Sequence, residues 1–284
     1  MRLSVSAGVM VAAACALFGT ATARGSQPDL DGSKLVKVSL VADHAIVTPG
    51  QSFDIGVRFE IEPEWHIYWD GQNESGMPVS FQWALPAGWS AGEVRWPCPV
   101  RYVGGGDILD YVFEREVTAL VRVTVPKDAN PGDVKLDLKT DYLVCKEACL
   151  PGSASIARSI RVAESPVASN AEETASILAA RKRLPSDFAS AKGLSATWQD
   201  RRLSIVATGA TRIEFDPHEP GATLPEAIRQ GVTKGGTLTL EFEASQANKD
   251  ALGMLRIWTD KGESTYWYRS PVGGVLAPTD GMNR

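Results

Sequence analysis

The sequence is poor in the residues that most often mark a metal or hydrolytic site. Its 284 residues include only four cysteines and three histidines. They do not form the double cysteine pair of a zinc site, and we find no phosphate-binding loop and no Ser/His/Asp arrangement. The net charge is −5, and basic residues form no strong run, which argues against nucleic acid as a main partner. We therefore expect no organic cofactor.

Long apolar runs are also scarce, and the only strong one lies at the N-terminus. Arg2 precedes an uncharged stretch from Leu3 to Phe18, and Ala21-Thr22-Ala23 fits a small-x-small cleavage site. This pattern predicts a signal peptide over residues 1–23. A competing interpretation treats Cys15 as the acceptor of a lipoprotein box. No other segment is long and apolar enough to span a bilayer, so we expect an exported, periplasmic protein.

The rest of the chain indicates an all-β protein. Hydrophobic content is 44% and charged content 22%, which suffices for two ordinary cores. Short alternating runs, such as Phe53 to Ile61, are separated by Gly- and Pro-rich turns, as in an antiparallel sandwich. We predict a disordered lead-in over 24–34, a first β domain over 35–163, a helical linker over 164–194 with its helix at 172–184, a smaller sandwich-like β domain over 195–273 and a tail over 274–284.

Two cysteines separated by three residues form the most informative motif. Residues 134–144 alternate as a half-buried strand, and a second strand-like run follows Cys149. Lys146-Glu147-Ala148 has the length of a hairpin connection, which would place Cys145 opposite Cys149. Cross-strand Cα separations of roughly 4.5 Å lie within the range that a disulfide tolerates. The spacing permits a bond.

The function of such a bond is open on spacing alone. A disulfide stabilises mainly by constraining the unfolded chain, and a very short loop gives it little to constrain. The pair is therefore either a local structural clip or a redox pair that opens and closes. Removal of Cys15 with a signal peptide would leave Cys98 as an odd thiol, either a small buried side chain or a third participant near the pair.

Five ordered motifs resemble a known family. They are Trp65-His66-Ile67-Tyr68-Trp69, Glu74-Ser75-Gly76-Met77-Pro78, Leu85-Pro86-Ala87-Gly88-Trp89, Trp96-Pro97-Cys98-Pro99 and Leu143 to Gly152 around the cysteine pair. In this order they resemble the N-terminal periplasmic domain of the thiol:disulfide interchange protein DsbD. The Cys-x3-Cys spacing resembles the ScsB-like branch of that family.

The resemblance implies an immunoglobulin-like β-sandwich whose cysteine pair passes electrons to thioredoxin-like periplasmic proteins, as a protein-disulfide reductase component. Cys145 and Cys149 would be that pair, with Cys149 forming the mixed disulfide. The sequence contains no recognisable membrane conduit or thioredoxin domain, so the resemblance implies a separate membrane electron donor. Cys98 departs from the family pattern, where we expect a small residue without a thiol.

Aromatic residues suggest a cover for the sulfurs. Trp65, Tyr68 and Trp69 would form a loop over the pair, with His66 and Tyr142 as further lid or partner-binding candidates. Each is equally explained by packing in a sandwich core.

Two other classes of function remain open at this point. The pair with Cys98, Met77 or His66 would suit copper(I), a soft ion that binds thiolates. The second class is a non-catalytic binding module with a fixed disulfide.

Overall fold

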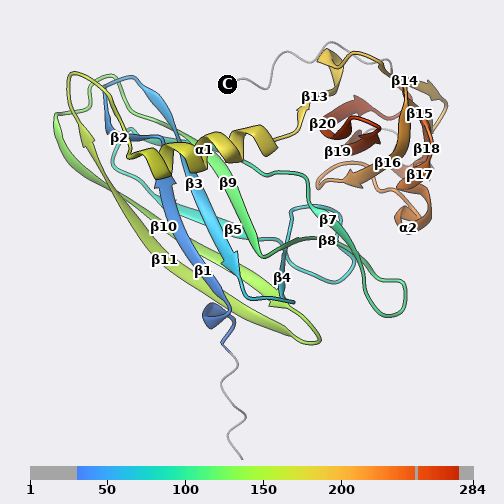
Figure 1. Ribbon diagram of the computed structural model, residues 1–284, viewed down its shortest axis with the longest axis horizontal. Helices are drawn as coiled ribbons and strands as arrows, with labels where there is room; N and C mark the ends of the chain where they lie inside the picture. The colour runs from blue at the N-terminus through green and yellow to red at the C-terminus, as the bar shows by residue number, and fades with distance from the viewer. Residues whose placement is uncertain (1–30, 247–248, 275–284) are drawn as a thin grey trace, which may run out of the picture. The chain divides into compact units, whose positions relative to one another are not determined.

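The computed structural model describes residues 31–246 and 249–274, and most of these residues lie in β-strands (Figure 1). The predicted signal peptide, the lead-in up to residue 30 and the tail from residue 275 lie outside the described residues. Within the described part of the chain, no helix has the length and apolar character needed to cross a membrane.

The N-terminal half forms an immunoglobulin-like β-sandwich, which confirms the predicted fold class. One sheet has the order β1-β3-β9-β6, and all its neighbours are antiparallel. The other has the order β12-β2-β11-β10-β4-β8-β7, with β5 paired to β10. The strands are β1 (Val36–Ala42), β2 (His44–Val47), β3 (Ser52–Ile61), β4 (His66–Tyr68), β5 (Ser80–Ala84), β6 (Ser90–Arg95), β7 (Val100–Val103), β8 (Leu109–Glu114), β9 (Glu116–Thr124), β10 (Gly132–Cys145), β11 (Cys149–Val162) and β12 (Val167–Ala168).

The core of this sandwich follows the alternation seen in the sequence. Phe53, Ile55, Val57 and Phe59 of β3 are buried on one face and pack with side chains from the facing sheet. Alternate residues of a strand point to opposite faces, so a period of two sends one set into the core. Such burial of apolar area is the main driving force for forming the sandwich.

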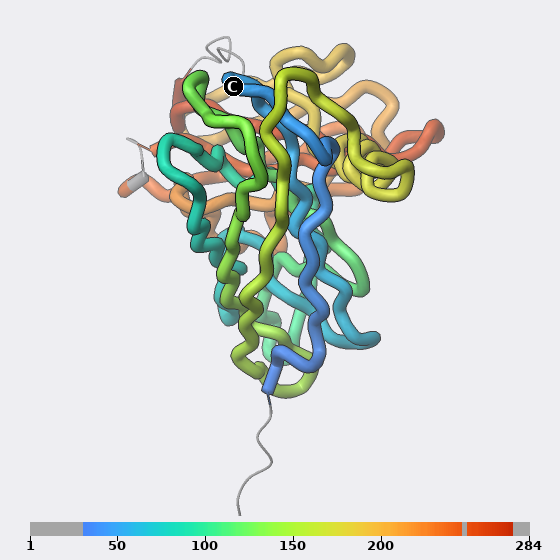
Figure 2. Tube along the Cα trace, turned by 90° about the vertical axis from the view of Figure 1, so that its left-hand side faces the viewer, coloured from blue at the N-terminus to red at the C-terminus, as the bar shows by residue number. Residues whose placement is uncertain are grey.

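The longest element is the hairpin of β10 and β11. The two strands pair without a break from Gly132 opposite Val162 to Cys145 opposite Cys149, and they run side by side in Figure 2. Near the tip, the 3-10 turn η1 (Gly32–Lys34) packs on β11, and the Ser33 hydroxyl oxygen accepts a hydrogen bond from the Ser153 amide at 2.9 Å. The last residues of the predicted disordered lead-in are thus ordered, because the hairpin supplies partners for them.

Helix α1 (Ala171–Arg183) lies across β1, β3 and β9 (Figure 1), close to the helix predicted over 172–184. The Asn170 side chain caps its N-terminus by accepting from the Glu173 amide at 2.9 Å. Ile177 of this helix is fully buried and packs with Leu120 of β9. At its C-terminal end, Arg181 contacts Asp54 of β3, a fully buried carboxylate.

The C-terminal strands form two further sheets, which we call the C-terminal sheets. Their orders are β13-β20-β19-β16-β17 and β14-β15-β18. They enclose a second hydrophobic core, which includes Phe215 and Tyr268. The domain boundaries stay predictions. The elements are β13 (Ser186–Asp187), η2 (Phe188–Ser190), β14 (Leu194–Gln199), β15 (Arg202–Ala207), β16 (Ala210–Pro217), α2 (Ala227–Gln230), β17 (Val232–Lys234), β18 (Thr237–Glu241), η3 (Ala244–Gln246), β19 (Asp250–Thr259) and β20 (Gly262–Pro271).

Candidate thiol–disulfide site

Cys145 and Cys149 form a disulfide at the tip of the long hairpin. Cys145 is the last residue of β10 and Cys149 the first of β11, and they are directly paired with their Cα atoms 4.2 Å apart. Residues 146–148 form the connection. The cross-strand geometry expected from the sequence is therefore confirmed.

The two sulfur-bearing residues differ sharply in exposure. Cys145 is 2% exposed and lies in a small apolar cluster with Tyr68 and Val112, flanked by Leu143. Cys149 is exposed. A group that approaches the disulfide from solvent therefore meets Cys149 first. A thiolate is also disfavoured on the buried Cys145, because burial in an apolar environment penalises the charged form.

Tyr68 lies in hydrogen-bonding contact with the disulfide. Its hydroxyl oxygen lies 3.7 Å from the Cys149 Sγ and 3.3 Å from Nε2 of His66. Burial, aided by the negative charge of Asp110, raises the pKa of Tyr68 above its ordinary value. The hydroxyl therefore keeps its proton at neutral pH and can donate to a thiolate on Cys149, which would favour the charged sulfur.

His66 lies opposite Cys145 in the pairing of β4 with β10. Its ring is buried, tilted against the Tyr102 ring with centroids 4.6 Å apart. Burial lowers the pKa of His66, and the charges of Glu114 and Asp110 oppose that shift only in part. The imidazole is therefore neutral near pH 7 and serves as a hydrogen-bonding neighbour of Tyr68.

The loop after Tyr68 folds back over its ring. A Cβ added to Gly76 would lie 1.9 Å from the Tyr68 Cε1, so only glycine fits here without displacing the ring. Asp110, which is 2% exposed, holds this loop by accepting hydrogen bonds from the Ser75 amide at 3.0 Å, from the Ser75 hydroxyl and from the Gly76 amide at 3.4 Å. The loop is thus fixed next to the sulfurs by a buried carboxylate.

The other lid candidates lie elsewhere. Trp69 and Tyr142 are buried in the main sandwich core, and Trp65 packs against that core from its edge. None of the three side chains forms a hydrogen bond with the disulfide in the part of the chain that the structure describes. The reason is the two-residue period of the strands: Ile67 and Trp69 face the core, whereas His66 and Tyr68 face the disulfide.

Asp110, Tyr102 and Val112 belong to the site and were missed in the sequence. The signal was present, since Leu109 and Tyr111 of β8 are core residues and Asp110 and Val112 must occupy the other face. Alternation along β8 alone would have placed Asp110 on the same side as the site.

Cys98 makes its contacts with the C-terminal sheets. Its thiol donates to Oδ2 of Asp216 at 3.6 Å, and Arg256 donates to its backbone carbonyl at 3.2 Å. Burial, followed by the nearby Asp216 charge, raises the pKa of Cys98 far above its ordinary value. Cys98 is therefore a protonated thiol with low nucleophilicity, and a role as a third thiol stays a prediction.

Asp216 gives a measurable pH dependence of stability. It is fully buried, and its carboxylate lies 3.5 Å from Arg101. Burial raises the pKa of Asp216 to about 6 from an ordinary 3.8, although Arg101 and Arg256 oppose the shift. The folded protein therefore binds a proton between pH 4 and 6 that the unfolded chain does not, so this group lowers stability progressively as the pH rises through that window.

Asp216→Asn, which imitates the neutral acid, is expected to match the wild type near pH 4. Above pH 6 it should be more stable by on the order of 2–3 kcal/mol. Urea unfolding of both proteins at a series of pH values measures the difference. A difference that does not change with pH, or an asparagine variant less stable at pH 7, would contradict the expectation.

Metal-binding groups do not converge in the described part of the chain. No cluster of three or more His, Cys, Asp or Glu side chains suited to a metal occurs there. Of the residues considered for copper, His66 lies beside Cys145, Met77 is exposed, and Cys98 contacts Asp216 instead.

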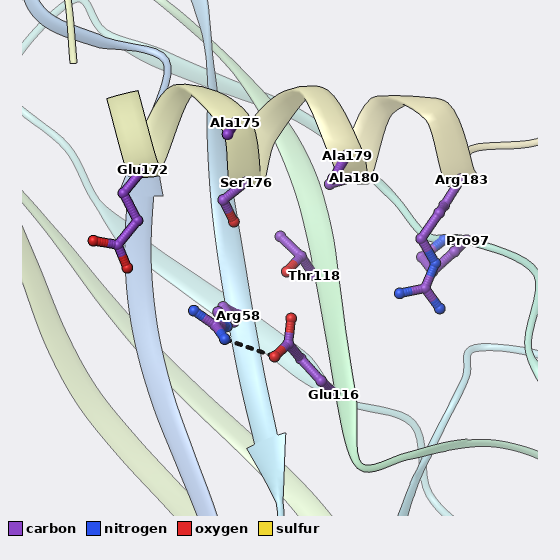
Figure 3. A pocket seen from close by; sticks show the side chains of 10 residues that line it. All are labelled: Arg58, Pro97, Glu116, Thr118, Glu172, Ala175, Ser176, Ala179, Ala180 and Arg183. Carbon is purple, nitrogen blue, oxygen red and sulfur yellow. Dashed lines mark hydrogen bonds and ion pairs between the residues drawn. The ribbon is translucent and has the colours of Figure 1, made fainter. Parts of the chain in front are cut away.

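A separate hollow of about 340 Å³ lies beneath α1 (Figure 3). Small residues of the helix, including Ala175 and Ala179, face the Arg58–Glu116 ion pair across it, with N···O at 2.6 Å. No cysteine lines this hollow, so it is not part of the thiol site.

Comparison with known proteins supports the interpretation of the cysteine pair as a thiol–disulfide site. Residues 34–159 match the family model described as thiol:disulfide interchange protein DsbD, N-terminal. No curated protein matches the chain. Among solved structures, the N-terminal periplasmic domain of ScsB from Proteus mirabilis is 16% identical with a TM-score of 0.55, covering 87% of this chain and 97% of its own. The reduced DsbD N-terminal domain from Neisseria meningitidis is 18% identical with a TM-score of 0.27, covering 50% and 95%.

At this identity, the ScsB likeness establishes the fold and extends it over both sets of sheets. The family model covers the sandwich that carries the cysteine pair. This match and the disulfide at the hairpin tip together support thiol–disulfide exchange as the chemistry. Residues 34–159 therefore form a DsbD-like N-terminal domain.

Proposed function

We propose that the protein exchanges electrons with thioredoxin-like proteins in the periplasm through the Cys145–Cys149 pair. Cys149 is the sulfur that meets the partner, and Cys145 is the resolving cysteine. The observation that carries this assignment is the difference in exposure between the two residues, 2% for Cys145 against an exposed Cys149. The solved relative described as the periplasmic domain of ScsB supports the location.

The exchange proceeds in two balanced steps. In the reduced protein, the Cys149 thiolate attacks one sulfur of the partner's disulfide, and the partner's other sulfur leaves as a thiolate that takes up a proton. The Cys145 thiol then loses its proton and attacks the Cys149 Sγ. This step restores the Cys145–Cys149 disulfide and releases the second partner sulfur as a thiol, so two electrons pass to the partner. A separate membrane protein returns the pair to the dithiol.

The reduction potential of the pair tests this function. We expect a value of roughly −270 to −180 mV, the range of thioredoxin-like exchange proteins, after equilibration with dithiothreitol or glutathione and thiol trapping. Cys98→Ser should give the same value, because Cys98 contacts the C-terminal sheets and not the pair. A potential well below about −300 mV, together with no exchange with a thioredoxin-like protein, would make the bond a structural clip.

A further inference from the structure

We propose that the C-terminal sheets position Tyr68 and Tyr102 beside the disulfide and thereby set the reactivity of Cys149, with Gln72 and Arg101 as the positioning residues. The inference rests on the proposed role of Cys149 as the reacting sulfur. Two separate anchors carry it, and each lies within a few residues of one of the two tyrosines.

The first anchor follows Tyr68. The Gln72 amide donates to the Pro217 carbonyl at 2.9 Å, and the Gln72 side-chain Nε2 lies 3.1–3.4 Å from the carbonyl oxygens of His218, Gly221 and Ala222. Gly71 also forms an isolated β-bridge with His218. Residues 71 and 72 are therefore docked on the last residue of β16 and on the segment that follows it.

The same loop continues directly to the disulfide. After Gln72 it passes over Tyr68, where Gly76 lies against the ring and Asp110 holds the Ser75 amide. One short stretch of chain thus runs from the C-terminal sheets to the Tyr68 ring, and between them Asn73 and Glu74 accept hydrogen bonds from the Tyr111 and Leu109 amides of β8. A shift of the anchor would move the hydroxyl that lies 3.7 Å from the Cys149 Sγ.

The second anchor precedes Tyr102. The Arg101 side chain is only 8% exposed, and its guanidinium donates to the carbonyls of Phe215 at 3.2 Å and Ala227 at 2.8 Å. Tyr102, the next residue of β7, has its ring 4.6 Å from the His66 ring. A guanidinium with two fixed carbonyl acceptors holds one orientation, because its planar donors form a rigid fork. Both tyrosines near the sulfurs therefore depend on contacts outside the domain that carries the cysteines.

The pH profile of Cys149 alkylation in the fully reduced protein tests the proposal. Iodoacetamide is the probe, and peptide mass spectrometry separates Cys149 from Cys145 and Cys98. Tyr68→Phe removes the hydroxyl and is the reference for complete loss of its hydrogen bond to the Cys149 sulfur. Gln72→Met removes the side-chain donor without adding charge, and Arg101→Lys keeps the charge but loses the fork.

Gln82→Met is the matched control, because Gln82 is exposed on β5 and its side chain makes no hydrogen bond with the described residues. We expect Tyr68→Phe to move the half-maximal pH upward and to slow alkylation at pH 7 by about threefold, since the lower thiolate fraction is partly offset by a more nucleophilic thiolate. Gln72→Met and Arg101→Lys should move the profile in the same direction, and Gln82→Met should overlay the wild type.

The proposal is overturned if Gln72→Met and Arg101→Lys both fold and overlay the wild type while Tyr68→Phe shifts. It is equally overturned if Tyr68→Phe leaves the profile unchanged. Because there are two independent anchors, the test stays valid if one of the two variants fails to fold. A contact with a merely structural role would change thermal stability without moving the pH profile. The readout uses no protein partner, so failure of exchange with a thioredoxin-like protein would reject the proposed function separately.

Discussion

Replacing Asp54 with alanine is expected to lower the free energy of unfolding by about 3–5 kcal/mol, because it removes a buried carboxylate from a cluster of charged partners. Asp54 is fully buried and accepts hydrogen bonds from Arg95 at 2.8 Å, Arg122 at 2.7 Å and Arg181 at 2.6 Å. Burial alone would raise the pKa of Asp54, but the hydrogen bond of Arg181 and the charges of Arg95 and Arg181 lower it. The stabilisation is therefore present at neutral pH and is lost as the pH falls through that lowered value.

Asp137→Ala is the matched control. Its carboxylate pairs with Lys135 at 2.6 Å on the surface of β10, where the Lys135 side chain is 64% exposed and that of Asp137 44%. Exposed pairs contribute little, so we expect a change of at most about 0.5 kcal/mol. Chemical denaturation at pH 7 measures both variants. Equal losses in the two variants would contradict the role assigned to Asp54, and loss of α1 docking in Asp54→Ala should appear as faster amide exchange in residues 171–183.

Cys145→Ser is expected to accumulate a mixed disulfide with a thioredoxin-like partner, whereas Cys149→Ser should form almost none. The exposed Cys149 can attack the partner in the first variant, but the serine at position 145 cannot resolve the bond. In the second variant the remaining Cys145 is buried. Non-reducing electrophoresis and mass spectrometry of the reduced variants, mixed with the oxidised partner, measure the adduct.

Cys98→Ser is the control for that experiment, since the Cys98 thiol donates to Asp216 and its raised pKa keeps it protonated, so it should not form the adduct. It should turn over the partner at the wild-type rate without accumulating an adduct. Trapping through Cys145 in preference to Cys149 would reverse the assignment of the two sulfurs. Trapping through Cys98 would restore that residue as a participant.

The hairpin and its disulfide were predictable because their determinants are local. Alternation up to Val144 fixed which residues face the core, and three connecting residues fixed the pairing of the cysteines. The unequal exposure of the two sulfurs was not predictable, because it depends on β4 and β8, which are joined to the hairpin only in the folded sheet. The sequence predicts an aromatic lid at residues 65–69, whereas strand β4 directs Tyr68 toward the disulfide and the following Trp69 lies in the sandwich core.

The contacts of Cys98, Gln72 and Arg101 lay further beyond sequence reasoning. Their partners are 114 to 158 residues away along the chain. A proline-flanked cysteine and a glutamine in a polar loop carry no local pattern that identifies such partners. Only the packing of one set of sheets against another determines that these side chains are buried or hydrogen-bonded.

The unbroken pairing of β10 with β11 has a consequence for how the two redox forms differ. Fourteen residue pairs hold the hairpin together up to the cysteines, so opening the bond releases no length of chain and leaves the strand order unchanged. The oxidised and reduced forms should therefore have nearly the same shape and hydrodynamic size. A partner that distinguishes the two forms would have to sense a few atoms around Cys149, and the proposed redox cycle would need no refolding step.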